Sequence, residues 1–373
     1  MESYKELDDF FFHHFKNWHP ERIAFLTFYI LALIKTKSVN SSEIATALNP
    51  CAKKESNQRR IENFFAHQDI SHQVVALLIL AILPTKKYRI SIDRTNWKYG
   101  KTDINILMLC VNYMGIGIPV YWLCLEKRGN SNTSERIELL DAFISLFGQK
   151  RIKYLLADRE FVGEEWFKYL KKRKIPFYIR IRENFHLQDF DAKLRVKFLF
   201  DRPRPGVYRG GRICGVKLNV VGRRLSKKER EEENEEMLIV VTNKPVGDPA
   251  ETLKTYKQRW EVETLFRAYK RKGFNLESTH ITDPGRIRKL VALLSLALVW
   301  CYKMGVKYDA CYEPIEVKKH GYKQYSYVKY GLDVLCNILF GLTMKRVEFS
   351  NAVILFTMKG FENSLSGLLE NST

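Results

Sequence analysis

The chain has 373 residues, a formal net charge of +20 and a hydrophobic share of 46%. This length exceeds one small domain and fits two or three, and the apolar content is too high for a chain that is mainly disordered. Excess lysine and arginine creates a positive field that attracts polyanions, so nucleic acid is the favoured partner; the alternative is a basic protein whose charge only keeps it in solution.

The seven cysteines favour reduced thiols, because they are odd in number and contain no CxxC pair that would indicate a zinc site. The N-terminus carries acidic residues where a signal peptide needs basic ones. The most apolar run, LVALLSLALVW, is short for a membrane span and adjoins Arg286, Arg288 and Lys289. We therefore expect a buried helix, no membrane partner and a cytoplasmic protein.

Residues 1–85 are predicted to form a helical DNA-binding domain. Apolar residues recur at three- and four-residue spacing in ERIAFLTFYILALI, and Ser41 or Ser42 could cap the helix SSEIATALN. A second helix, KKESNQRRIENFFAH, carries Arg59 and Arg60. The pair could be a helix-turn-helix, although a plain helical bundle is nearly as consistent with the pattern.

Residues 86–305 are predicted to form an α/β catalytic domain. Three strands come first, KYRISIDRTNW, INILMLCVNY and IPVYWLCLE. The helix SERIELLDAFISLFG, the strand IKYLLAD, the helix GEEWFKYLKKRK and the strand FYIRIR follow. Hairpin strands followed by strands that alternate with helices predict a mixed sheet with helices on both faces.

A β-rich insertion is predicted at about residues 185–245. Its strands include VYRGGRICGVKLNVVG and MLIVVTN, and the charged run LSKKEREEENEE between them is typical of a solvated loop or hairpin tip. The α/β pattern then resumes with a long helix over about 249–272 and another over about 285–304. Residues 306–373 are predicted to be a helical C-terminal segment.

Two aspartates lie where the predicted sheet could place a site. Asp93 is inside an alternating strand, where a carboxylate is costly unless its charge is satisfied. Asp158 ends an apolar run of the kind found in buried parallel strands, and α/β proteins place sites at the carboxyl ends of such strands. Taken singly, an exposed edge strand would explain Asp93, and a helix N-cap would explain Asp158.

The predicted helix over 249–272 has one polar face. At about 100° per residue, four side chains fall in one stripe: Tyr256, Arg259, Glu263 and Lys270. The opposite face carries residues expected in the core: Val262, Leu265, Ala268 and Tyr269. Glu261 points nearer that core, so Glu263 is the carboxylate aligned with the stripe. The alternative is a solvated face on which Arg259 and Glu263 form an i,i+4 pair.

Together these motifs resemble a DDE transposase of the bacterial insertion-sequence-four family, over roughly residues 85–305. The first Asp lies in IDRTNW and the second in LLADREFVGEEWF. The third acid lies in a Tyr-x2-Arg-x3-Glu-x6-Lys signature, which the four polar residues of the stripe match without a gap. The β-rich insertion before the Glu is also placed as in the family. The resemblance implies a ribonuclease H-like fold.

The resemblance also implies the reaction. Asp93, Asp158 and Glu263 would be catalytic and would hold two Mg²⁺ ions, for which Mn²⁺ can substitute. The protein would bind transposon ends, cut them by phosphodiester hydrolysis and join the 3′ ends to target DNA, as a homodimer that acts in the bacterial cytoplasm beside the nucleoid. A ribonuclease H-like nuclease that never joins DNA, or a non-catalytic DNA-binding descendant of a transposase, are the alternatives.

The same resemblance assigns DNA contacts. Tyr256, Arg259 and Lys270 would contact phosphates near the cleaved end, which suits a hydroxyl, a planar guanidinium and a point charge. Trp260 would stack on a flipped base if cleavage passes through a hairpin; its alternative role is that of an aromatic at the edge of the core. For the basic run 171–174, a solvated helix end is favoured over a DNA contact.

Overall fold

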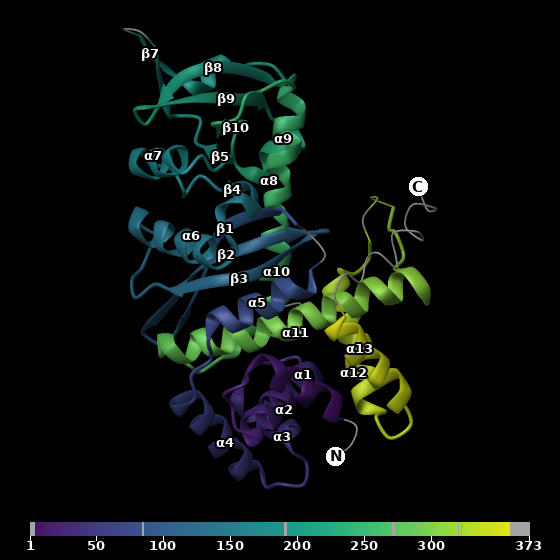
Figure 1. Ribbon diagram of the computed structural model, residues 1–373. Helices are drawn as coiled ribbons and strands as arrows, with labels where there is room; N and C mark the ends of the chain where they lie inside the picture. Colours follow the sequence, from purple (N-terminus) through teal and green to yellow (C-terminus); the bar gives the residue numbers. More distant parts are fainter. Residues whose placement is uncertain are drawn as a thin grey trace. The chain divides into compact units, whose positions relative to one another are not determined.

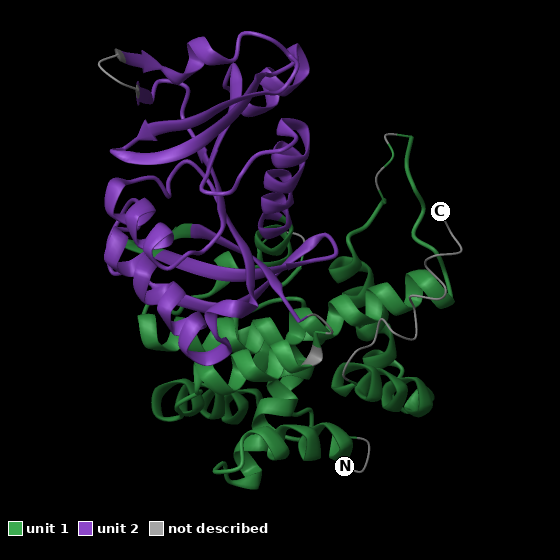
Figure 2. Ribbon diagram, turned by 45° about the horizontal axis from the view of Figure 1, so that its top comes forward, with its two compact units in different colours: residues 1–85, 96–104, 264–373 green, residues 86–95, 105–263 purple. Residues whose placement is uncertain are grey.

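The computed structural model describes residues 4–83, 86–189, 192–270, 273–319, 321 and 323–358. The chain folds into two units of interleaved segments, which Figure 2 colours separately. Unit 1 comprises residues 1–85, 96–104 and 264–373, and unit 2 comprises residues 86–95 and 105–263. The three-part division predicted from the sequence stays a prediction; the N-terminal helices share unit 1 with the helices that follow residue 283.

The β-forming runs of the sequence make one ten-stranded sheet, most of whose strands are labelled in Figure 1. Its strands, in spatial order, are β3 (Ile116–Cys124), β2 (Thr102–Tyr113), β1 (Tyr88–Tyr99), β4 (Ile152–Ala157), β5 (Phe177–Ile181), β10 (Met237–Thr242), β9 (Val216–Arg224), β8 (Gly206–Ile213), β6 (His186–Asp189) and β7 (Ala192–Arg195). β1, β4 and β5 pair in parallel, and β2 and β3 pair antiparallel. The first five strands therefore have the order and directions of a ribonuclease H-like sheet, as predicted.

Helices cover both faces of this sheet in unit 2. Helix α6 (Thr133–Phe147), which begins at an Asn132 capping box, packs on β3, and α7 (Glu164–Lys172) packs near β9. The Phe167 ring of α7 stacks on Phe177 of β5, whereas the next residue, Tyr178, packs against the cluster that contains Leu253 of α9 (Pro249–Lys257). Successive strand residues point to opposite faces, so α7 and α9 lie on opposite sides.

The insertion contains a helix that the sequence did not indicate. The charged run expected to be a solvated loop forms α8 (Lys227–Glu233) between β9 and β10, and it begins at a capping box of Ser226 and Glu229. Glu233, at its end, lies 2.5 Å from Arg180 of β5. The prediction of a loop was wrong, because the Ser-x-x-Glu capping pair and an ion pair to the sheet stabilise a short helix. The remaining elements of the insertion are strands and a 3₁₀ turn, η3 (Val196–Leu199).

The long helix predicted over 249–272 is interrupted. Helix α9 ends at Lys257, a 3₁₀ turn η4 (Gln258–Trp260) follows, and α10 (Glu261–Tyr269) continues the chain. The carbonyl of Gln258 accepts a hydrogen bond from Asn112 Nδ2 of β2 at 2.6 Å, and its side chain accepts one from Tyr154. These contacts turn Gln258 toward the sheet, which explains the break; residues 271 and 272 lie outside the described part of the chain.

The N-terminal segment of unit 1 is helical, as predicted. Its helices are α1 (Lys5–His14), α2 (Pro20–Thr36), α3 (Ser41–Leu48), α4 (Lys54–His67) and α5 (His72–Ile82). Asn40, rather than Ser41 or Ser42, caps α3, because its side chain accepts from the Ser42 N–H at 3.0 Å. Buried Asn57 of α4 donates to the carbonyls of Ala45 and Asn49 and so holds α4 against the end of α3.

Helix α11 (Pro284–Cys311) is the centre of unit 1 and packs against α2, α5, α12 (Tyr327–Phe340) and α13 (Arg346–Thr357). It has 28 residues, and 94% of its most apolar window is buried. The expectation of a buried helix is confirmed, but the expectation that the segment is too short to cross a membrane was wrong, because the helix extends well beyond the apolar run.

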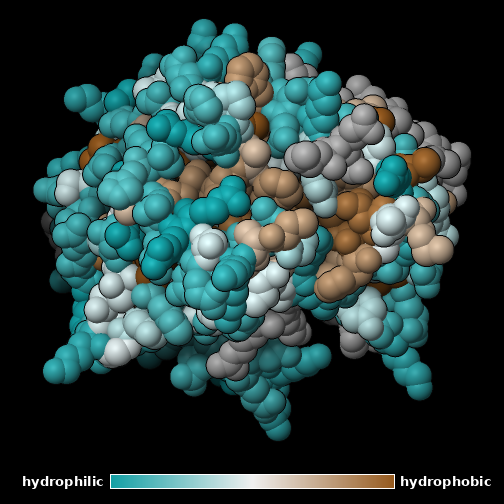
Figure 3. Space-filling model, turned by 90° about the horizontal axis from the view of Figure 1, so that it is seen from below, coloured by the Kyte–Doolittle hydropathy of each residue, from teal (hydrophilic) through white to brown (hydrophobic). Residues whose placement is uncertain are grey.

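In the described residues, α11 alone has the length and composition of a membrane span, and the bent pairs α2–α3 and α4–α5 would each qualify if counted as one span. Figure 3 shows one face of the molecule, where mainly hydrophilic side chains surround smaller apolar areas. The C-terminal segment is helical as far as it is described; residues 359–373 lie outside the described part.

Two glycines let α11 and α12 touch through their backbones. A Cβ on Gly331 would lie 1.8 Å from the carbonyl oxygen of Cys301, and one on Gly305 would lie 1.8 Å from that of Tyr327. Gly331→Ala should therefore force the helices apart and lower the free energy of unfolding by about 1–3 kcal/mol or more. Urea denaturation measures this change.

The matched control is Gly247→Ala, because no atom lies within 4 Å of a Cβ at that position. It should unfold at the same urea concentration as the wild type. A Gly331→Ala protein as stable as the wild type would show that the two helices can separate without cost.

Candidate active site

Strand pairing brings the two predicted aspartates together. β1 and β4 run parallel with Ile92 opposite Ala157, so Asp93 and Asp158 occupy the next positions along neighbouring strands. Side chains at matched positions of paired strands point to the same face. The two carboxylates are therefore neighbours at the carboxyl end of β4, and their role as metal ligands stays a prediction.

The surroundings of Asp93 disfavour its charge. Burial raises the pKa of Asp93 to about 6, and the negative charges of Asp158 and Glu160 raise it as well. Arg259 and the Arg94 N–H act in the opposite direction, the latter through a 2.7 Å hydrogen bond to Asp93 Oδ1. A nearby cation stabilises the charged form of a carboxylate most strongly in surroundings of this kind.

Arg259 connects Asp93 with Glu263. Its Nη1 lies 3.2 Å from Asp93 Oδ2, and its Nη2 lies 2.7 Å from Glu263 Oε1. Arg259 is 5% exposed. Burial lowers its pKa, but the acidic groups around it raise the pKa by more, so the guanidinium stays charged. The i,i+4 pair of Arg259 and Glu263, weighed as an alternative, is present; its arginine is buried and its glutamate half-exposed.

Tyr256 supports Arg259 from inside unit 2. Its hydroxyl accepts a hydrogen bond from Arg259 Nε at 3.2 Å, and its ring belongs to a buried apolar cluster with Val221 and Leu253. Burial raises the pKa of the Tyr256 hydroxyl. In this structure Tyr256 is a packed residue that orients Arg259, and its contact with DNA phosphate stays a prediction.

The start of α10 is tied to the sheet, and this places Glu263. Glu261 Oε1 accepts from the Gly115 N–H at 3.1 Å, so Glu261 faces the core side as expected. Gly117 of β3 lies so near the backbone of Val262 that a Cβ there would be 3.0 Å from Val262 Cα. Glu263, the next residue, is half-exposed and can reach solvent while it holds Arg259.

The remaining two predicted DNA-binding residues have different settings. Trp260 in η4 is 44% exposed, and Lys257 Nζ lies 5.8 Å from the centre of its ring. Lys270 belongs to unit 1, where its Nζ lies 2.8 Å from Glu277 Oε1 and 3.3 Å from the carbonyl of Asn96. Tyr256, Arg259 and Glu263 are thus linked within unit 2, while Lys270 lies in the other unit.

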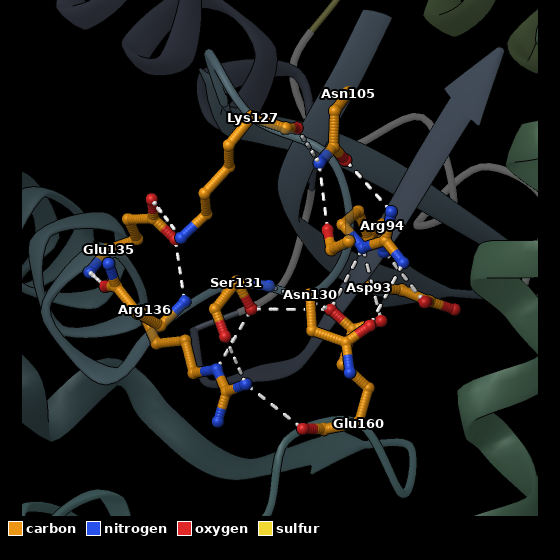
Figure 4. Close-up of polar contacts among 11 residues, drawn as sticks. Asp93, Arg94, Asn105, Lys127, Asn130, Ser131, Glu135, Arg136 and Glu160 are labelled. Carbon is orange, nitrogen blue, oxygen red and sulfur yellow. Dashed lines mark hydrogen bonds and ion pairs between the residues drawn. The ribbon is translucent and has the colours of Figure 1, made fainter. Parts of the chain in front are cut away.

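Two ion pairs beside the aspartates were missed from the sequence. Arg94, which follows Asp93, pairs with Glu160, as Figure 4 shows. Arg159, which follows Asp158, pairs with Glu235 of the insertion. The available signal was the dipeptide Asp-Arg, which occurs within β1 and directly after β4, but no pattern in the sequence names the two glutamate partners.

The donor set fits divalent metal ions. Asp93 and Asp158 supply neighbouring carboxylate oxygens, the ligands preferred by hard cations such as Mg²⁺, and like-charge repulsion between them would fall when a cation binds. Over the described residues, no three His, Cys, Asp or Glu side chains form a ready metal-binding group. Glu263 is joined to Asp93 through Arg259 rather than directly.

Comparison with known proteins gives a family for most of the chain. Residues 84–300 match the family described as "Transposase DDE domain". The chain is also similar to piggyBac transposase, solved by cryo-electron microscopy as a synaptic complex with hairpin DNA. The sequence identity is 13%, 93% of this chain and 78% of that chain are covered, and the TM-score is 0.42. No curated protein sequence matches the chain.

The raised pKa of Asp93 predicts that the charged carboxyl lowers the free energy of unfolding of the metal-free protein, and that this penalty depends on pH. Above pH 6 the carboxyl is charged in both the folded and the unfolded chain, and the folded chain bears the full penalty. As the pH falls toward 4, the folded chain takes up the proton first and the penalty disappears. Asp93→Asn should therefore raise the free energy of unfolding at pH 8 by up to about 3 kcal/mol and should match the wild type near pH 4.

Urea denaturation in EDTA at both pH values tests this difference. Asp201→Asn is the control, because Asp201 is almost fully exposed, and it should change stability at neither pH. A destabilised Asp93→Asn protein at pH 8 would show that the pairing with Arg259 outweighs burial.

Proposed function

Because the chain belongs to the family of transposases with a DDE catalytic domain, we propose that it performs cut-and-paste DNA transposition. It binds the inverted-repeat ends of a transposon, cuts them by metal-dependent hydrolysis and joins the freed 3′ ends to target DNA. The observation that carries this proposal is the register of β1 and β4, which makes Asp93 and Asp158 neighbours, with Glu263 linked to Asp93 through Arg259.

In this proposal Asp93, Asp158 and Glu263 hold two Mg²⁺ ions, and Mn²⁺ can replace them. Such ions, when bound, activate the attacking oxygen and neutralise charge on the scissile phosphate. The protein's own contribution is to present the carboxylates. The N–H of Arg94 fixes Asp93, and the N–H of Arg159 fixes Asp158, each at 2.7 Å.

Arg259 has a second role in the proposal. Its positive charge, held by Tyr256 inside unit 2, compensates Asp93 and Glu263 before any cation arrives. A guanidinium can also bind phosphate through its planar fork. With cations held by Asp93 and Glu263, these carboxylates would no longer need the charge of Arg259, and one side of its fork would be available to the DNA backbone.

The proposal includes partners and lineage. We assign the chain to the insertion-sequence-four group because its Tyr-x2-Arg-x3-Glu-x6-Lys signature has no gap. We expect it to act as a homodimer that brings two transposon ends together, and to do so in the bacterial cytoplasm. End recognition falls to α3 and α4, where Arg59 and Arg60 are exposed on a helix pair fixed by Asn57. Deleting residues 1–85 would uncover the apolar side of α11, so substitution of the two arginines is the cleaner test of recognition.

Replacing Asp93, Asp158 or Glu263 with Ala should abolish cleavage and joining while DNA binding is retained, because each change removes a metal ligand and no packing residue. The substrate is an end-labelled duplex that carries the DNA flanking the gene, with Mg²⁺ and a supercoiled target plasmid. Gels resolve cut and joined products, and electrophoretic mobility shifts measure binding.

Glu251→Ala is the matched control, since Glu251 is an exposed acid on α9 of unit 2, and it should cut and join normally. Normal joining by any of the three alanine variants removes that residue from the site. Cleavage by the wild type without joining would favour a ribonuclease H-like nuclease, and binding without cleavage would favour a non-catalytic descendant.

Trp260 carries a separate prediction that depends on a hairpin step. Hairpin formation bends the DNA end so tightly that a base leaves the stack, at a cost of a few kcal/mol. An exposed indole can offset this cost, since stacking on an aromatic contributes about 1–3 kcal/mol per base. Trp260→Ala should leave first-strand nicking nearly unchanged and slow hairpin formation roughly ten- to a hundredfold, at ~1.4 kcal/mol per decade.

Denaturing gels separate nicked, hairpin and fully cut DNA. Trp260→Phe should recover part of the rate, and Phe340→Ala, which removes an exposed aromatic of α12, should have no effect. The stacking role is refuted if the wild type forms no hairpin, or if Trp260→Ala slows nicking and hairpin formation equally.

A further inference from the structure

Strand β1 and the loop that follows β4 are joined by one ion pair. Arg94 directly follows Asp93, and Glu160 lies two residues after Asp158. Arg94 Nε lies 3.0 Å from Glu160 Oε1 and 3.2 Å from Oε2. The pair thus connects the two chain segments that carry the aspartates, and Figure 4 shows it among its neighbours.

Every nitrogen of the Arg94 guanidinium has a partner. Nη1 donates to Asn105 Oδ1 at 3.0 Å, and Nη2 donates to Asn130 Oδ1 at 3.4 Å. Asn105 is buried in β2 and donates to the carbonyls of Lys127 and Gly129. The arginine is therefore locked in one orientation by β2 and by the loop after β3.

Glu160 is held as firmly. Its Oε1 accepts from the N–H of Ser131 at 3.3 Å and from the Ser131 hydroxyl at 3.4 Å. Its backbone carbonyl accepts from Arg136 Nη2 at 3.0 Å, and the buried Arg136 lies over the Phe161 ring. Both ends of the ion pair are thus anchored in the fold of unit 2.

We propose that the Arg94–Glu160 pair is a brace that fixes the spacing between the Asp93 and Asp158 carboxylates, so that the two side chains can share divalent cations. Both are positioning residues: neither is a metal ligand in the proposal. The inference rests on the proposed function, because it concerns the same carboxylates.

The brace is needed because strand pairing stops short of Asp158. The β1–β4 register ends with Ile92 opposite Ala157, so no ladder hydrogen bond sets the position of Asp158. Arg94 directs one N–H, that of Nε, at both oxygens of Glu160, while Asn105 and Asn130 hold its Nη1 and Nη2. A planar guanidinium held at all three nitrogens resists sliding, which a lysine ammonium does not. Partners of this kind around metal ligands typically change metal affinity by about 10–100-fold when they are removed.

A simple charge effect makes the opposite prediction. Loss of the Arg94 positive charge near Asp93 would make the site more negative, and through-space attraction would then tighten cation binding. Loss of a brace would weaken cation binding, because the carboxylates no longer hold their spacing. The sign of the change therefore separates the two explanations.

The experiment measures Mn²⁺ binding to the full-length chain, with free Mn²⁺ quantified by electron paramagnetic resonance. Arg94→Met should raise the dissociation constant at least about tenfold. Arg94→Lys keeps the charge but loses the fork and should fall between Arg94→Met and the wild type. Circular dichroism and urea midpoints establish that each variant is folded, and Arg94→Lys decides the question if Arg94→Met is not.

Arg223→Met is the matched control. Arg223 and Glu229 form an ion pair of similar burial, with side chains 16% and 30% exposed against 15% and 17% for Arg94 and Glu160. This variant should bind Mn²⁺ like the wild type. Tighter or unchanged binding by the folded Arg94 variants overturns the brace, as does equal weakening by Arg223→Met.

The failure of the proposed function gives a different result. If the Asp93→Ala variant binds Mn²⁺ as tightly as the wild type, the proposed metal site is wrong, and the brace is refuted with it. If Asp93→Ala abolishes binding and the Arg94 variants do not weaken it, only the brace is refuted.

Discussion

The structure of unit 2 depends on one constraint: two carboxylates must stay close together at the end of a parallel strand pair. The register of β1 and β4 places Asp93 beside Asp158, where burial and the neighbouring carboxylate raise the pKa of Asp93 and oppose its charge. A site of this kind costs folding free energy until a cation arrives. Much of the polar structure around it can be understood as compensation for that cost.

Compensation comes from arginines on three different elements. Arg259 of η4 bridges Asp93 and Glu263, Arg94 pairs with Glu160, and Arg159 pairs with Glu235. Arg259 pairs with Asp93 itself, whereas Arg94 and Arg159 pair with glutamates near the two aspartates.

The insertion takes part in this arrangement. Arg180 of β5 is buried, and it pairs with Glu233 at the end of α8 and with Glu235 just after it. Glu235 also pairs with Arg159, next to Asp158. The insertion therefore extends the sheet beyond β5 and also supplies acidic partners to the basic residues around the site.

Local patterns in the sequence predicted which segments become strands and where Asp93 and Asp158 stand on them, because alternation and buried apolar runs are local properties of a strand. The ribonuclease H-like arrangement of these strands was expected from the family resemblance, and the structure has it. Only the tertiary structure decided the break at Gln258, the burial of Tyr256 and the Arg94–Glu160 pair. Each of these depends on a partner distant in sequence, such as Asn112 for Gln258. Periodicity reports which face of an element is apolar, but it does not report which distant polar group meets it when the chain folds.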